Sequence, residues 1–388
     1  MLVKSLAFDT GQGSYLTDRP VSGKFDLVYV PSSKDVLAEH ITLNLDGHPY
    51  KFDGSFNTDN NNGDFHLNIS TKNVKYNRAT SLLRPPLRKK MDEYAISEPI
   101  SFEVKMSGKT THQSMPLIEA FMDVRNNKVS TPMGIFENCS FKGRYLNEKV
   151  KGKKRTDENS ILEFKDFSGS WQKIDIHSKD ILLSNLTTPF LECDVSADAD
   201  MESLNSLAGS SSFKFNKGRL SMNVVYRGTV VGKDSAAANI NGTVTFNRAS
   251  IKYIPRNFTL DNCSGDLKFA NNNLLVNRIS ATAGKTKLVM TGSAKNFLSM
   301  LDVSPEKLII DWKITSPSLH LQDFTGFLSK AQSTKAEKKN TQFGLTASKV
   351  DRLFSEGDMY IQLQAPQMDY KTFEAQNVVA KVVLKPDA

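Results

Sequence analysis

The histidines are the first residues to test for chemistry, because an imidazole titrates near neutral pH and binds metals. The chain has six of them, at His40, His48, His66, His112, His177 and His320. No two of them stand at a metal-ligand spacing, and none belongs to a His-Glu-x-x-His motif. Single histidines on strands usually lie at the surface or have a structural role. The sequence therefore predicts neither a metal site nor a catalytic histidine.

A second candidate is the Gly284-Lys285-Thr286 tripeptide, which resembles the end of a phosphate-binding loop. That motif requires a glycine five positions before the Gly-Lys pair, where this chain has Ile279, and it must open a helix. The residues that follow Thr286 alternate like a strand, so the tripeptide is predicted to be a hairpin turn. Nucleophile-elbow and dinucleotide-binding motifs are absent. We therefore expect a protein that is not an enzyme and that needs no cofactor.

The three cysteines, Cys139, Cys193 and Cys263, are far apart and form no Cys-x-x-Cys pair. This excludes a zinc knuckle, a redox pair and a dense disulfide framework. Six Asn-x-Ser/Thr tripeptides are also present. In a secretory eukaryotic protein they could carry glycans, whereas in an asparagine-rich bacterial chain they would be chance, and we favour the second interpretation. They begin at Asn68, Asn138, Asn185, Asn241, Asn257 and Asn262.

Composition fits a folded chain, with 39% hydrophobic and 24% charged residues. The formal net charge of +8 suits an anionic surface, but the charges are scattered. The densest basic cluster, 149–155, lies between strand-like segments and is predicted to be a solvated loop. Nucleic-acid binding would require basic residues interleaved with aromatic ones on one face. Here the aromatic residues fall on the apolar phase of strands, so no nucleic-acid partner is predicted.

No apolar segment approaches the ~20 residues that span a bilayer as a helix. The first residues, from Met1 to Phe8, are too short and too soon polar for a signal peptide. We expect either a cytosolic protein or a piece whose targeting segment lies upstream.

The elements that would position any site are strands, because apolar and polar residues alternate through much of the chain. Side chains with a period of two point to opposite faces of a strand, so each segment has one apolar and one polar face. Short turn signals such as Asn241-Gly242 separate these segments. The prediction is a mostly β fold, an elongated and curled antiparallel sheet that forms an open groove.

Short helical segments are predicted near 81–94, 200–207, 295–301 and 349–355. The first three recur at intervals of roughly 100 residues, which is typical of repeated units joined by links. The predicted units are 1–95, 96–210 and 211–328, followed by continuing strands at 350–388. Between them, 329–349 has no large apolar residue after Leu328 until Phe343 and is predicted to be a mobile polar insertion.

A sheet with one apolar face must bury that face. The alternatives are a packed sandwich or barrel, and an open gutter whose interior accepts acyl chains. In a gutter, the apolar phase would line the groove. The predicted lining residues are Phe102, Val104, Met106, Leu220, Met222, Val224, Tyr226, Val244, Phe246, Leu267, Phe269, Leu288 and Met290.

Five segments of the chain resemble the C-terminal region of the AsmA-like family, in the form found in the large proteins of the Bacteroidetes. The resemblance is specific over about 215–330, and it is weaker from about 80 and again from 350 onward. The segments are 217–228, 240–253, 258–280, 288–298 and 316–324.

This resemblance implies a bacterial envelope protein related to the bridge-like lipid transfer proteins, which are built from repeated β-groove units. Family members are anchored in the inner membrane by an N-terminal helix, which this chain lacks, and project into the periplasm. They are linked to outer-membrane biogenesis and to phospholipid transport between the inner and outer membranes. The expected partners are phospholipid acyl chains, both membranes and other envelope proteins. The alternative is a structural or protein-interaction module of the envelope. A third possibility is an extracellular adhesin, but an adhesin would be expected to expose clusters of tryptophan and tyrosine, and the chain has only two tryptophans.

Overall fold

The structure is a computed structural model, and it describes most of the chain. The described residues are 2–6, 16–24, 26–59, 63–81, 88–89, 91–109, 115–132, 134–208, 213–229, 238–271, 273–297, 309–328 and 358–384. They hold 22 strands, assigned to one mixed sheet that is not closed into a barrel. Strands account for 74% of the structure, so the mostly β, open-sheet class predicted from the sequence is confirmed.

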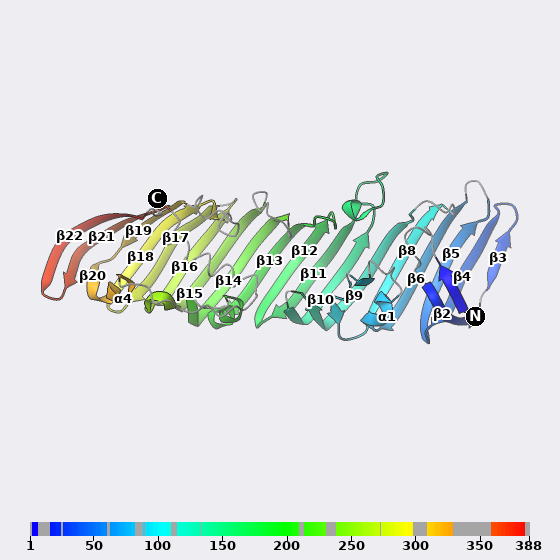
Figure 1. Cartoon of the computed structure of the whole chain (residues 1–388), viewed down its shortest axis with the longest axis horizontal. Helices are drawn as coiled ribbons and strands as arrows, with labels where there is room; N and C mark the ends of the chain where they lie inside the picture. The colour runs from blue at the N-terminus through cyan, green and yellow to red at the C-terminus, as the bar shows by residue number, and fades with distance from the viewer. Residues whose placement is uncertain are drawn as a thin grey trace. The chain divides into compact units, whose positions relative to one another are not determined.

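The chain divides into two compact units, and strand β12 contributes to both. Unit 1 contains residues 1–171 and 177–191, and unit 2 contains residues 172–176 and 192–388. The unit boundaries predicted at 95 and 210 rest on the repeat of helical links, and they stay predictions. Each unit is described by itself (Figure 1).

Unit 1 is an antiparallel meander in which β4, β5, β6, β8, β9, β10 and β11 pair in that order. Strands β2 and β3 both pair with β4, and β1 pairs with β2. Its strands are β1 Leu2–Leu6, β2 Leu16–Lys24, β3 Leu27–Val30, β4 Asp35–Leu45, β5 His48–Asn57, β6 Asp64–Val74, β7 Ala95–Ile96, β8 Ile100–Lys109, β9 Leu117–Thr131, β10 Gly134–Leu146, β11 Ile161–Trp171 and β12 Ile174–Ser184. Its helical elements are α1 Tyr76–Thr80 and η2 Asp157–Asn159.

Unit 2 continues the same pattern, because β14 to β19 pair as consecutive antiparallel neighbours. The order then changes, since β21 pairs parallel with β19 and antiparallel with β22. Its strands are β13 Phe190–Asp200, β14 Phe213–Thr229, β15 Asn239–Tyr253, β16 Phe258–Ala270, β17 Asn273–Ala283, β18 Thr286–Lys295, β19 Ile309–Thr315, β20 Ser318–His320, β21 Asp358–Tyr370 and β22 Phe373–Leu384. Its helical elements are η3 Met201–Ser203, α3 Leu204–Ala208, η5 Ile254–Arg256, η8 Leu321–Phe324 and α4 Thr325–Leu328.

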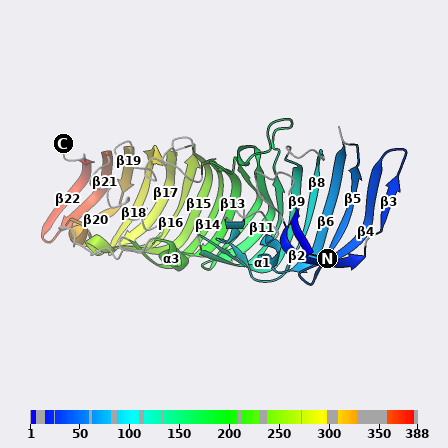
Figure 2. The same ribbon diagram turned by 45° about the vertical axis from the view of Figure 1, so that its right-hand side comes forward.

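The helical links α1 and α3 are short, and each lies at one end of the strands of its own unit (Figure 2). The link predicted at 200–207 is confirmed by η3 and α3. Within the link predicted at 81–94, residues 88–89 and 91 are helical, and a separate helix, α1, precedes it at Tyr76–Thr80. The segment predicted at 295–301 starts inside β18, and its residues from 298 onward lie outside the described part. The predicted helix at 349–355 and the predicted insertion at 329–349 also lie outside it.

A polar network around Asp323 joins η8 and β20 to the turn between β17 and β18 and, through His320, to β21. The Asp323 carboxylate accepts hydrogen bonds from the backbone N–H groups of Lys285 and Thr286 and from the Thr286 hydroxyl, at 2.9, 3.0 and 2.8 Å. Thr286 Oγ1 in turn accepts the backbone N–H of His320 at 3.0 Å, and His320 Nδ1 lies 2.5 Å from Asp369 Oδ1. The Gly284–Lys285 pair is therefore a structural turn between β17 and β18, as predicted.

Bulges with a left-handed residue interrupt the strands of both units. The same tripeptide, Asn-Cys-Ser, occurs on β10 at 138–140 and on β16 at 262–264, and its asparagine has φ of 54° and 50°, respectively. In both places the register shifts, and the serine hydroxyl accepts a backbone N–H from the preceding strand. A bulge bends its strand and increases the local twist. The Asn-x-Ser pattern at these two places therefore coincides with a bulge in the strand.

This assignment predicts the outcome of substitutions at Asn262. Valine has a branched Cβ that is strained at positive φ, so Asn262→Val is expected to lower the free energy of unfolding by about 1–2 kcal/mol. Asn262→Gly should be nearly neutral because glycine adopts this conformation readily. Urea denaturation measures both, with Asn223→Val on the exposed phase of β14 as the control. Equal stability of the two valine variants would contradict a strained bulge.

Candidate functional site

Three rows of apolar residues cross unit 2 on one phase of its sheet. Residues paired across neighbouring strands share a face, so the registers define each row directly. Every position in the three rows is apolar or glycine. The first row is Leu220, Phe246, Gly265, Ile279, Met290, Ile314, Leu363 and Ala380. The second is Met222, Val244, Leu267, Val276, Gly292, Trp312, Ile361 and Val382, and the third is Val224, Gly242, Phe269, Leu274, Ala294, Ile310 and Met359.

Unit 1 has an equivalent row on seven of its strands. Its members are Ile41, Phe52, Ile69, Val104, Ala120, Tyr145 and Leu162. Phe102 and Met106 lie two residues to either side of Val104 on β8, and therefore on the same phase. Each unit thus presents an apolar face that is free of charged side chains along these rows.

All 13 lining residues predicted from the sequence lie on these two apolar phases. Phe102, Val104 and Met106 belong to unit 1, and the other ten belong to unit 2. Their side chains differ in how far they are sealed from solvent. Met106, Leu288 and Met290 are buried, whereas the remaining ten are half-buried.

The sealed part of the unit 2 face lies next to its helical links. Met201 of η3 and Leu204 of α3 pack in one cluster with Ala249, Cys263 and Met290. The η3 and α3 elements therefore cover the start of β14, the end of β15 and the start of β16. This region is packed protein core, and it explains why the Met290 side chain is only 6% exposed.

An open patch remains further along the same strands, toward the opposite ends of β14, β15 and β16. We define the open patch as Val224, Tyr226, Ile240, Val244, Leu267 and Phe269, all of which are half-buried. Phe269 contacts Phe297 with ring centroids 5.8 Å apart, and the Tyr226 hydroxyl donates to the Thr229 carbonyl at 3.2 Å. Contiguous apolar surface that stays open to solvent can mark a binding site.

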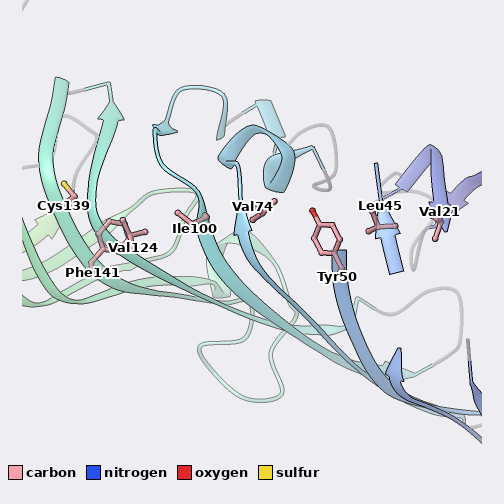
Figure 3. Packing of buried hydrophobic residues seen from close by; sticks show 8 residues of the cluster. All are labelled: Val21, Leu45, Tyr50, Val74, Ile100, Val124, Cys139 and Phe141. Carbon is pink, nitrogen blue, oxygen red and sulfur yellow. The ribbon is translucent and has the colours of Figure 1, made fainter. Parts of the chain in front are cut away.

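In unit 1, the corresponding packed region is a row of side chains along β2 to β10. Figure 3 shows its eight buried members side by side, with a helical turn close to Val74. Tyr76 and Ala79 of α1 pack against this cluster, and the Tyr76 hydroxyl donates to the Met91 carbonyl at 3.0 Å. Burial raises the pKa of Tyr76 to about 12. The helical link of unit 1 therefore seals its apolar face as η3 and α3 seal that of unit 2.

Cys139 and Cys263 belong to these packed regions. Cys139 and Cys263 are fully buried, and desolvation raises the pKa of each thiol to about 11. Burial also raises the pKa of Cys193. A thiol is nucleophilic only as the thiolate, so the raised pKa disfavours the reactive form of these thiols. Among the described residues, no group of three or more His, Cys, Asp or Glu side chains is placed to hold a metal ion.

The opposite phase of unit 2 is polar in its central strands. A shallow hollow of about 660 Å³ there is lined by side chains that include Arg219, Thr245, Asp266 and Arg278. The charged and hydroxyl side chains of such a surface suit water and ions better than an acyl chain. The two faces of the unit are therefore chemically distinct, and the apolar one is the candidate site.

Several residues of the apolar rows were not found from the sequence. Ile279 escaped because the register shifts on β17, which hides its alternation with Val276. Trp312 and Ile361 lie on β19 and β21, whose parallel pairing cannot be read from a meander pattern. The alternation of Ile310, Trp312 and Ile314 was the signal that could have identified β19.

The fold and the apolar rows define an open-sheet protein with an apolar face in each unit. In comparisons with known families, curated proteins and solved structures, no family model matches the chain and no protein or structure is significantly similar to it. The resemblance to the AsmA-like family therefore stays a prediction. Within the described part of the chain, the helices are too short or too polar to cross a bilayer.

Proposed function

We propose that this protein is a non-enzymatic lipid-binding protein that holds phospholipid acyl chains against the open patch of unit 2. The observation that carries the proposal is the set of three apolar rows, which no charged residue interrupts on β14 to β22. An acyl chain laid along such a row removes methylene groups from water, and each contributes about 0.8 kcal/mol. The half-buried state of the open patch supports an apolar ligand, since a packed core would leave those side chains sealed.

The cellular setting of this proposal comes from the resemblance to the AsmA-like family. On that basis the protein acts in the periplasm, tethered to the inner membrane by an N-terminal helix outside this chain. Its role would be phospholipid transport between the inner and outer membranes, in support of outer-membrane biogenesis. The open sheet is compatible with this role because an unclosed face lets a lipid enter from the side.

The alternative is a structural or protein-interaction module of the envelope without a lipid conduit. The sealed clusters favour it, because the helical links of both units close part of the apolar face with protein side chains. The two functions differ in what occupies the open patch. In a lipid-binding protein the occupant is an acyl chain, and in an interaction module it is another protein.

Native mass spectrometry of the full chain, purified without detergent and followed by lipid extraction, tests the proposal. The expected result is co-purified phospholipid, and transfer of a fluorescent phospholipid from vesicles to the delipidated protein. A protein that is free of lipid and that takes up none from phosphatidylethanolamine and phosphatidylglycerol vesicles would overturn the proposed function.

A further inference from the structure

The loop between β10 and β11 carries the densest basic cluster of the chain, and hydrogen bonds define its conformation. We define the basic loop as residues 147–160, all of which the structure describes. It lies at the strand ends opposite α1 and extends past them in both views (Figures 1 and 2). At its start, the buried Asn147 side chain accepts the backbone N–H of Ile118 at 2.8 Å and donates to the Pro116 carbonyl at 2.9 Å. The loop is therefore tied to the beginning of β9.

A second buried asparagine, Asn159, fixes the tip of the basic loop, which we define as residues 149–154. Its side-chain oxygen accepts the backbone N–H of Val150 at 2.9 Å. Its side-chain nitrogen donates to the carbonyls of Val150 and Lys154, at 3.2 Å each. The Asn159 carbonyl also accepts the backbone N–H of Lys149 at 2.7 Å. Both ends of the tip are thus bound to one buried residue.

The single arginine of the basic loop is used within the fold. Arg155 donates to the Met115 carbonyl at 2.8 Å and forms an ion pair with Glu148 at 3.5 Å. The other two acids of the loop lie outside the tip, in η2, where the Asp157 carbonyl accepts the backbone N–H of Leu186 at 2.8 Å. The charge of the tip is therefore entirely basic.

The tip presents four lysines around one apolar side chain. The lysines are Lys149, Lys151, Lys153 and Lys154. All four are exposed, and none is ion-paired within the part of the chain that the structure describes. Val150 lies between the first two lysines and is 46% exposed, because the bonds to Asn159 hold its backbone and leave its side chain outside. A loop that is already ordered loses little conformational freedom when a partner binds.

The chemistry of the tip favours an anionic lipid surface over a nucleic acid or an acidic protein. Nucleic acids are bound through arginine forks and aromatic stacking, but the basic loop has no aromatic residue and its arginine is bound within the fold. Protein interfaces centre on the same aromatic and arginine anchors. Lysine is a point charge on a flexible apolar stem, so it matches the diffuse charge of lipid headgroups. An exposed valine among lysines matches the apolar boundary beneath those headgroups.

We propose that the basic loop is a docking site for the surface of an anionic phospholipid bilayer. The four lysines lie at the level of the headgroups, and Val150 enters the acyl boundary below them. This attachment goes beyond acyl-chain binding at the open patch of unit 2, because it holds the protein on a membrane without the extraction of a lipid. The two activities are carried by different residues and can fail separately.

Co-sedimentation of the full chain with vesicles tests the attachment. Vesicles that contain phosphatidylglycerol should pellet the protein at low salt. Pure phosphatidylcholine vesicles should not, and high salt should release the protein because it screens exposed charges. Changing the four tip lysines to glutamine is expected to weaken binding at least tenfold, since each lysine near an anionic surface adds to the attraction.

The matched control removes four exposed lysines elsewhere in unit 1 and should bind as the unaltered chain does. Its substitutions are Lys51→Gln, Lys72→Gln, Lys142→Gln and Lys179→Gln. Equal binding of the two lysine variants would overturn the proposal, and so would binding to a DNA duplex in place of the vesicles. Val224→Asp should still pellet with the vesicles, which separates this attachment from lipid binding at the open patch.

A tryptophan reporter tests the position of Val150. The emission of Val150→Trp should shift to shorter wavelength when phosphatidylglycerol vesicles are added, after subtraction of the unaltered chain. Ile135→Trp is the control, because Ile135 is 47% exposed but lies at the other end of β10, and its emission should not shift. An unshifted emission at residue 150, or the same shift at both positions, would contradict the proposed docking.

Discussion

Replacing Val224 with aspartate is expected to reduce bound lipid at least tenfold while the chain remains folded. Val224 lies in the open patch and pairs with Gly242 on the neighbouring strand β15. A carboxylate there would lose its hydration when an acyl chain covers it, and that cost opposes binding. In the lipid-free protein the same carboxylate keeps contact with water, since Val224 is only half-buried. Lipid extraction and the thermal unfolding transition measure the two effects on one preparation.

The matched control for this variant is Val225→Asp, one position along the same strand. Val225 points to the opposite, polar phase and is 42% exposed, so the new charge should change neither lipid binding nor unfolding. Loss of bound lipid in both variants would show that a charge anywhere on β14 reduces lipid binding, whichever face it lies on. If Val224→Asp unfolds the protein, the open patch is packed core and the structural alternative gains support.

The fold class could be predicted because alternation is a local property of the sequence. Each strand of unit 2 from β14 to β16 shows its apolar phase without reference to its neighbours, and all 13 predicted residues lie on the expected phase. The alternation could not predict how far each of these side chains is buried from solvent. Whether Met290 or Val224 is covered depends on where η3 and α3 pack, and that is set by contacts distant in the sequence.

The bulges and the parallel strand pair were beyond prediction for a different reason. A bulge depends on backbone conformation, and at Asn138 and Asn262 it is marked by a positive φ, which a hydrophobicity pattern does not reveal. Their Asn-x-Ser context was interpreted as chance, although the repeat of Asn-Cys-Ser in both units was visible. Parallel pairing of β21 with β19 depends on a crossover, whose end is held by Asp323, and single-strand periodicity contains no trace of such a connection.

An aspartate introduced into the sealed part of the apolar face is expected to affect stability differently from one introduced into the open patch. Met290→Asp is expected to destabilise unit 2 by several kcal/mol, because Met290 is buried among Met201, Ala249 and Cys263, and the new charge has no partner there. Its control is Thr291→Asp, the next residue along β18 and on the opposite phase, where the charge can reach water. Urea denaturation should show a much lower midpoint for Met290→Asp and little change for Thr291→Asp. Comparable stability of Met290→Asp and Val224→Asp would contradict the division of this face into a sealed cluster and an open patch, because only sealing by η3 and α3 distinguishes the two positions.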